Sequence, residues 1–157
     1  MKNIGWTLVV LNLLMAVGSG VFFLFVEKLD IVSWLAVNTC AVAILIFCVG
    51  FILHRGVILG FSIPFLLFYG TGGLMVFEWG WTAALLIPQI SHIIMTTTVI
   101  YIIIYLVVKR RWKAPLIGAI VGVALLSVLF PLQQNYQRQN PEILRHLHFK
   151  EGYSPLD

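Results

Sequence analysis

The sequence predicts an all-α, polytopic integral membrane protein, a bundle of five transmembrane helices, from its composition, its long apolar stretches and the placement of its cations. Of 157 residues, 61% are hydrophobic and 10% are charged, whereas a soluble domain carries about 25% charged residues. So few charges cannot cover the surface of a water-soluble domain. The composition therefore excludes a nucleic-acid-binding domain, a disulfide framework and a conventional soluble enzyme.

Five apolar stretches are long enough to cross a bilayer, whose hydrocarbon core of about 30 Å requires about 20 residues of helix. They are residues 4–26, 31–53, 56–77, 80–108 and 114–132. Helices are expected because lipid offers no hydrogen-bond partners to an unpaired backbone. The five stretches define a transmembrane domain over residues 1–132, and residues 133–157 form a polar C-terminal tail.

Charged residues mark the breaks between these stretches. Acidic residues occupy the first break, at 27–30, and Glu78 marks the third. His54 and Arg55 separate the second stretch from the third, and a count of four spans would bury both in hydrocarbon, which is costly. Five spans are therefore the better count.

The cations predict the orientation. Five crossings place six of the ten Lys and Arg, and none of the six Asp and Glu, on the side of the N-terminus. The decisive segment is the loop with Lys109, Arg110, Arg111 and Lys113. Because cytoplasmic loops are rich in Lys and Arg, we expect a cytoplasmic N-terminus and an external C-terminus in the plasma (inner) membrane.

The tail contains one helix-start pattern. Asn140 is a capping residue, Pro141 suits the first helical position and Glu142 suits the positive end of the helix dipole. A short helix on the outer membrane surface is one interpretation, and a solvated tail is the other. His146 and His148 point apart at this spacing, so no metal site is predicted.

Two glycine pairs predict close helix packing. Gly56 with Gly60, and Gly118 with Gly122, are both spaced four residues apart near the same end of their spans. Small residues at this spacing let two helices approach closely in lipid. Packing within the chain is the favoured interpretation, and a dimer interface is the alternative.

One polar layer is the candidate ligand site. Apart from tyrosines and boundary residues, His92 is the only ionisable side chain within the predicted hydrocarbon, and Gln89 shares its helix face. At about 1.5 Å of rise per residue, one polar residue of each helix reaches a similar depth. These residues are Ser19, Asn38, Tyr69, His92 and Ser127.

The layer has two interpretations. It lines an outward-facing pocket where His92 binds a ligand or relays a proton, or its members form interhelical hydrogen bonds worth about 0.6 kcal/mol each. The spans contain no Asp or Glu and no H-E-x-x-H or G-x-S-x-G motif, which disfavours metalloprotease and serine-hydrolase chemistry. No cofactor is predicted.

The favoured function is that of a small polytopic subunit or accessory of a membrane complex, or a small transport component. Its expected partners are the lipid bilayer and other membrane subunits or a second copy, without nucleic acid. The alternative is a membrane-embedded enzyme with His92 as acid or base, or an outward-facing binding module for a lipid or small hydrophobic ligand. The absence of a catalytic motif makes the enzyme the less favoured of these.

Overall fold

The computed structural model describes residues 2–110, 112–144 and 147, and this part of the chain is helical with no β-strand. Arg111 of the predicted topology loop, His146 and His148 lie outside the described residues. The elements are α1 (Lys2–Val21), a π-helical turn η1 (Phe22–Val26), α2 (Ile31–Val37), α3 (Thr39–Ile52), α4 (Gly56–Val76), α5 (Ala83–Lys109), α6 (Lys113–Gln139) and a 3-10 turn η2 (Pro141–Leu144).

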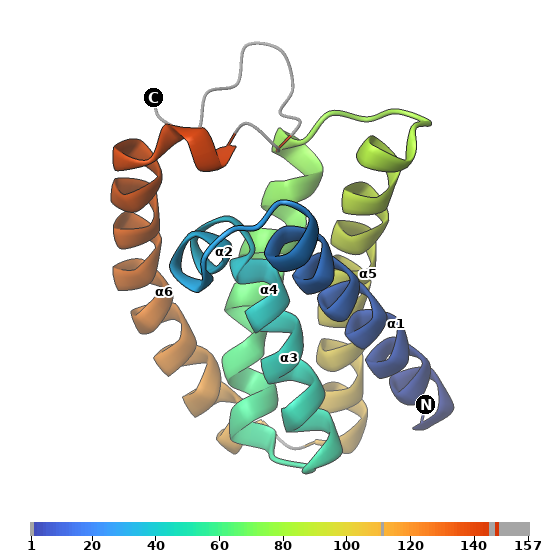
Figure 1. Ribbon diagram of the computed structural model, residues 1–157. Coiled ribbons are helices and arrows are strands. Elements are labelled where there is room, and N and C mark those ends of the chain that lie inside the picture. The colour runs from blue at the N-terminus through green and yellow to red at the C-terminus, as the bar shows by residue number, and fades with distance from the viewer. Residues whose placement is uncertain (1, 111, 145–146, 148–157) are drawn as a thin grey trace.

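Helix α4 holds the bundle together because α3, α5 and α6 all pack on it (Figure 1). Helix α1 lies obliquely at the edge of the bundle, against α3 and α5. The shared core consists of large apolar side chains from α3, α4 and α5. Phe47, Leu66, Met95 and Ile102 are its most deeply buried members.

Within the described part of the chain, four helical segments are long and apolar enough to cross a membrane, and a fifth candidate is the bent pair α2 and α3. The four are Asn3–Val26, Gly56–Val76, Leu85–Lys109 and Lys113–Gln139, and each overlaps one predicted span. Length and composition thus support an all-helical protein with four or five candidate membrane spans.

The predicted span 31–53 is not one continuous helix. Helices α2 and α3 meet at an angle of 84°, and the residue between them, Asn38, has φ −128° and ψ 36°. The break leaves the carbonyl of Ala36 without its usual partner four residues on. Gln133 and Gln137 of α6 donate to this carbonyl instead, at 2.8 and 2.7 Å, which makes the break tolerable in an apolar setting.

Helix α6 is longer than the predicted span 114–132, because it continues to Gln139. The extra turns carry the amides that hold Ala36. The predicted helix start at Asn140 is followed by one 3-10 turn, Pro141–Leu144, in which Ile143 is buried. The tail therefore begins as an extension of α6.

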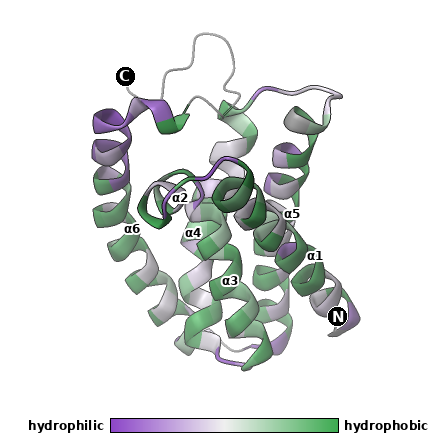
Figure 2. Cartoon of the chain, viewed as in Figure 1, coloured by the Kyte–Doolittle hydropathy of each residue, from purple (hydrophilic) through white to green (hydrophobic). Residues whose placement is uncertain are grey.

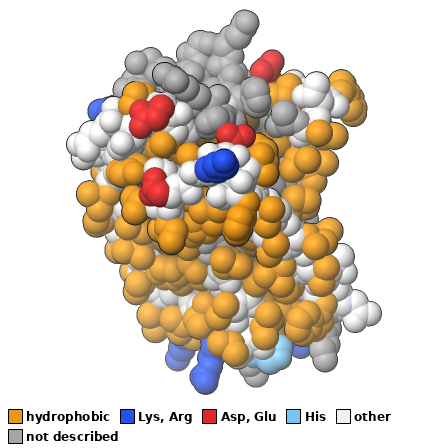
Figure 3. Space-filling view, viewed as in Figure 1, with side chains coloured by type: hydrophobic (Ala, Val, Ile, Leu, Met, Phe, Trp, Pro, Cys, Tyr) orange, Lys and Arg blue, Asp and Glu red, His pale blue; other side chains and the backbone are white. Residues whose placement is uncertain are grey.

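The charges divide between the two ends of the bundle. Apolar residues dominate the helices, and polar residues gather in the turns and along the last part of α6 (Figure 2). In the face drawn in Figure 3, the end below the apolar belt shows cations and a histidine without acids, whereas the end above it shows acids together with further cations. We call the end with His54, Arg55 and the α5–α6 turn the cationic end, and the end with Glu27, Asp30 and Glu78 the acidic end.

Asp30 begins α2 at the acidic end. Its carboxylate accepts hydrogen bonds from the backbone N–H groups of Val32 and Ser33, at 2.8 and 3.1 Å, and from the Ser33 hydroxyl. The Ser33 hydroxyl, followed by the Ser33 backbone N–H, lowers the pKa of Asp30 below its ordinary value. This helix cap fixes where the chain turns back into the bundle.

The predicted glycine pairs face each other across the α4–α6 contact. A Cβ atom on Gly60 would collide with the carbonyl of Pro115, and one on Gly118 would collide with the carbonyl of Val57. A Cβ atom on Gly122 would lie 2.7 Å from the backbone oxygen of Phe61 in α4, and one on Gly56 would lie 3.3 Å from the ring of Pro115. These glycines serve packing within one chain.

Candidate functional site

Gln89 fastens the α4–α5 connection to the first turns of α5. Its side chain is fully buried. The amide nitrogen donates to the carbonyls of Phe77, at 2.8 Å, and Glu78, at 3.3 Å. Gln89 therefore supports the backbone where α4 ends. These two hydrogen bonds use the nitrogen of its amide and leave the oxygen without a partner.

His92 lies one turn further along α5 and is enclosed by α4. Its imidazole is 6% exposed and stacks on Phe77, with ring centroids 5.2 Å apart and an interplanar angle of 18°. A Cβ on Gly73 would collide with the imidazole, so Gly73 provides the space that His92 fills. The ring is held by close packing against α4.

Two polar atoms on this face of α5 have no hydrogen-bond partner. They are Oε1 of Gln89 and Nδ1 of His92, both buried. The residues are three positions apart and so share a face. A buried acceptor without a partner costs about 1–3 kcal/mol. A small polar molecule at this face would give both atoms a partner, and this is the local argument for a small polar ligand.

Asn38 and Tyr69 belong to different hydrogen-bond groups. Asn38 donates to the Ser19 hydroxyl at 3.0 Å and accepts from the Cys40 thiol at 3.0 Å. Tyr69 donates to Oε1 of Gln133 at 2.6 Å. Asn38 therefore ties α1 to the α2–α3 break, whereas Tyr69 ties α4 to α6.

Ser127 does not face the other predicted site residues. It is exposed on α6 and donates within its own helix, to the carbonyls of Val123 and Ala124, at 2.8 and 3.0 Å. The predicted layer therefore divides into the Gln89–His92 face, the groups of Asn38 and Tyr69, and an outward Ser127.

The hydrogen bonds around α2 use residues that were not among the predicted site residues. Gln133 and Gln137 hold the Ala36 carbonyl, and the hydroxyls of Ser33 and Tyr136 lie 3.1 Å apart. The available signal was the spacing of the two glutamines, four residues apart, just past a predicted span. That spacing puts both amides on one helix face.

Asn12 was also missed. It is fully buried in α1, and its amide donates to the Thr98 hydroxyl on α5 and to the Leu8 carbonyl, both at 2.8 Å. Its Oδ1 has no partner. A lone asparagine in an apolar helix was the sequence signal, since such a residue normally bonds across helices.

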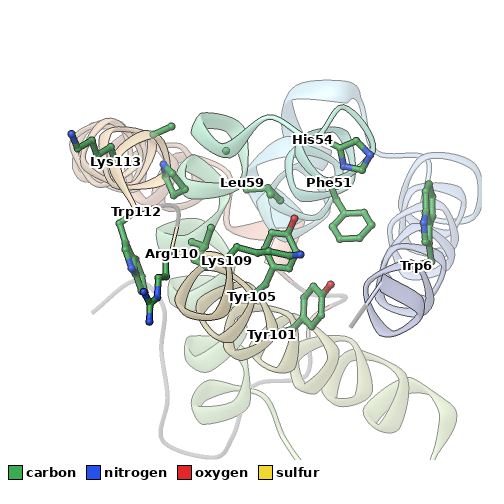
Figure 4. A pocket seen from close by; sticks show the side chains of 14 residues that line it. Trp6, Phe51, His54, Leu59, Tyr101, Tyr105, Lys109, Arg110, Trp112 and Lys113 are labelled. Atoms are coloured by element: carbon green, nitrogen blue, oxygen red, sulfur yellow. The ribbon is translucent and has the colours of Figure 1, made fainter.

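A pocket of about 720 Å³ opens at the cationic end (Figure 4). Its walls come from α1, α3, α4, α5, α6 and the turns between them. The polar and aromatic side chains lining it are Trp6, Phe51, His54, Tyr101, Tyr105, Lys109, Arg110, Trp112 and Lys113. This pocket combines cations with aromatic rings, and it lies at the opposite end of α5 from Gln89 and His92.

Neither site offers a ligand set for a metal ion. Among the described residues, no group of three His, Cys, Asp or Glu side chains could hold one. The thiols of Cys40 and Cys48 are free and are not joined in a disulfide. Comparison of the chain with protein-family models, with curated proteins and with solved structures found no match.

Proposed function

We propose that this chain crosses the plasma (inner) membrane five times, with a cytoplasmic N-terminus and an external C-terminus. Helix α3 has 14 residues, or about 21 Å at 1.5 Å per residue, which is short of a bilayer core. Helix α2 meets α3 at 84°, so its seven residues lie across the direction of α3 and add little depth. The broken pair leads from the acidic end to the cationic end, which supports a full crossing.

The orientation predicts the behaviour of reporter fusions. Alkaline phosphatase, which is active only outside the cytoplasm, is expected to be active when fused after residue 144 and inactive when fused after Trp112. The reason is the excess of Lys and Arg at the cationic end. Equal activity of both fusions would contradict a crossing by α6, and the reverse pattern would contradict the proposed orientation.

We also propose that the protein acts as a non-enzymatic subunit or accessory of a membrane complex. The observation that carries this proposal is how the polar side chains within the helices are used. Asn12, Asn38, Tyr69 and Gln133 all bond across helices, and His92 is packed against Gly73. Such groups join helices, so these side chains serve the packing of the bundle.

The surfaces left for recognition include the outward faces of α1 and α6. Large apolar side chains remain exposed along both helices, for example Leu14 and Val17 on α1 and Ile120 and Val128 on α6. A membrane protein contacts lipid or another subunit through such a face. The exposed surface is therefore suited to contact with neighbouring subunits in the plane of the membrane.

A cross-linking experiment tests this proposal. A photoreactive amino acid at Ile120 is expected to give a discrete adduct with a different membrane polypeptide, whereas one at the buried Leu66 gives none. The particle released in mild detergent is expected to contain that polypeptide at a fixed ratio, and His92→Phe leaves it unchanged. Adducts with lipid alone, or particles containing only copies of this chain, would contradict the proposal.

The second candidate function is an outward-facing binding module around His92. Its support is the pair of buried polar atoms without a hydrogen-bond partner, Oε1 of Gln89 and Nδ1 of His92, on one face of α5. His92→Phe tests this candidate. If the variant loses the phenotype that the parent chain restores in a deletion strain, while the detergent-released complex keeps its composition, the binding module is the better account of the function.

A further inference from the structure

The pocket at the cationic end is large enough for part of an amphiphile. Its volume of about 720 Å³ falls in the range of about 300–1,000 Å³ found for ligand pockets. Leu59 and Leu106 contribute apolar wall, and Pro115 closes the side toward α6. The chain thus encloses a partly apolar space next to its most basic turn.

Cations surround the opening without acidic neighbours in the chain. Lys109, Arg110 and Lys113 all line the pocket. The sequence has no Asp or Glu from residue 31 to residue 77 or from 79 to 141. The acids at Glu27 and Glu78 belong to turns at the acidic end. Among the described residues, no acid lies at this end, so an anionic ligand would find unopposed positive charge here.

The side chains divide the pocket into an outer and an inner part (Figure 4). Lys109 extends toward the rings of Tyr101 and Tyr105, whereas Arg110 and Lys113 point away toward the rim. Arg110 ends α5 with a φ of 50°, a left-handed turn that directs the chain to the next helix. One cation is thus directed inward and two remain at the entrance.

Aromatic rings form much of the inner wall. Trp6 meets Phe51 edge to face at 5.7 Å, and Tyr101 stacks with Tyr105 at 6.1 Å. Rings with a polar edge are enriched where headgroups meet acyl chains. Trp112 lines the opening next to the cations. This arrangement matches a ligand with an anionic head and an apolar tail.

We propose that this pocket binds one anionic phospholipid, with its phosphate beside Lys109 and the start of its acyl chains against Trp6, Tyr101 and Tyr105. Basic pockets between membrane helices are suited to anionic headgroups. The alternative source of the same chemistry is free inorganic phosphate, which would use the cations but leave the aromatic wall unoccupied.

Native mass spectrometry of the purified full chain tests the proposal. Phosphatidylglycerol is expected to remain bound as one molecule per chain under conditions that remove phosphatidylcholine. Lys109→Gln is expected to weaken retention about fivefold, from about 1 kcal/mol per cation near an anionic headgroup, and Lys109→Arg to preserve it. Lys28→Gln is the matched control, because it removes one cation at the acidic end.

A second measurement separates the lipid from free phosphate. Phosphatidylglycerol with brominated chains is expected to quench tryptophan fluorescence, and Trp6→Phe to remove a defined part of that quenching. Inorganic phosphate at equal concentration is expected not to displace the lipid. Displacement by phosphate, equal retention of phosphatidylcholine, or equal loss in Lys28→Gln would each overturn the proposal. Unchanged helical circular dichroism of Lys109→Gln excludes misfolding as the cause of its loss.

Discussion

Replacement of Gly118 by alanine is expected to lower the free energy of unfolding by about 3 kcal/mol or more. The new Cβ would collide with the carbonyl of Val57 and lie 2.7 Å from the backbone nitrogen of Phe61. Overpacking in a core costs about 1–3 kcal/mol where side chains can adjust. Here the obstructing atoms are backbone, so α4 and α6 must separate.

Gly72→Ala on α4 is the matched control, since a Cβ there meets no atom within 4 Å. Alanine is the better helix former by about 1 kcal/mol, so Gly72→Ala is expected to be as stable as the parent or slightly more so. Unfolding by increasing SDS in mixed micelles, followed by circular dichroism, measures both. Equal stability of the two variants would show that α4 and α6 do not pack this closely.

Loss of both Gln133 and Gln137 is expected to cost far more than the sum of the single losses. Both amides donate to the one carbonyl of Ala36. With either amide present the carbonyl keeps a partner, so Gln137→Met alone is expected to cost about 0.6 kcal/mol. Gln133→Met alone is expected to cost about twice as much, because it also removes the acceptor of the Tyr69 hydroxyl. Together they leave the carbonyl unpaired, at about 1–3 kcal/mol more.

A double-mutant cycle measured by the same SDS unfolding gives this coupling. Gln139→Met is the control, because Gln139 is exposed on the same helix. Additive losses from the two glutamines would mean that another group supports Ala36. Such a result would also remove the explanation offered for the length of α6.

Composition and hydropathy predict most of this architecture. Apolar stretches of about 20 residues can only be helices in lipid, and each predicted span overlaps helix. The glycine pairs were also informative, because a residue without a side chain has few uses in an apolar helix other than close approach. Gly60 and Gly118 make that approach to backbone of the opposite helix.

The break at Asn38 could not be predicted, because it depends on distant residues. The donors to Ala36 come from 97 and 101 residues further along the chain. No local pattern in 31–53 separates a straight span from one bent to meet those amides. The predicted end of the last span at residue 132 differs from the end of α6 for the same reason. The last turns of α6 are polar, and their helical structure is understood only from the hydrogen bonds of Gln133 and Gln137 to Ala36.

The polar layer shows what depth alone leaves undetermined. The rise per residue places Ser127 level with His92, but the rotation of each helix decides which way a side chain faces. Ser127 faces outward, and its hydroxyl donates to the carbonyl of Val123 in the preceding turn of the same helix. Asn12, which was not considered, faces inward and is fully buried.

The bond between Asn12 and Thr98 also has a consequence for biosynthesis. These residues are separated by 86 positions, and chains are made from the N-terminus at about 5–20 residues per second. The first helix is therefore made several seconds before its polar partner exists. Its docking against α5 has to wait for the fourth predicted span, so a ribosome stalled before residue 98 leaves the first helix without its hydrogen bond to α5.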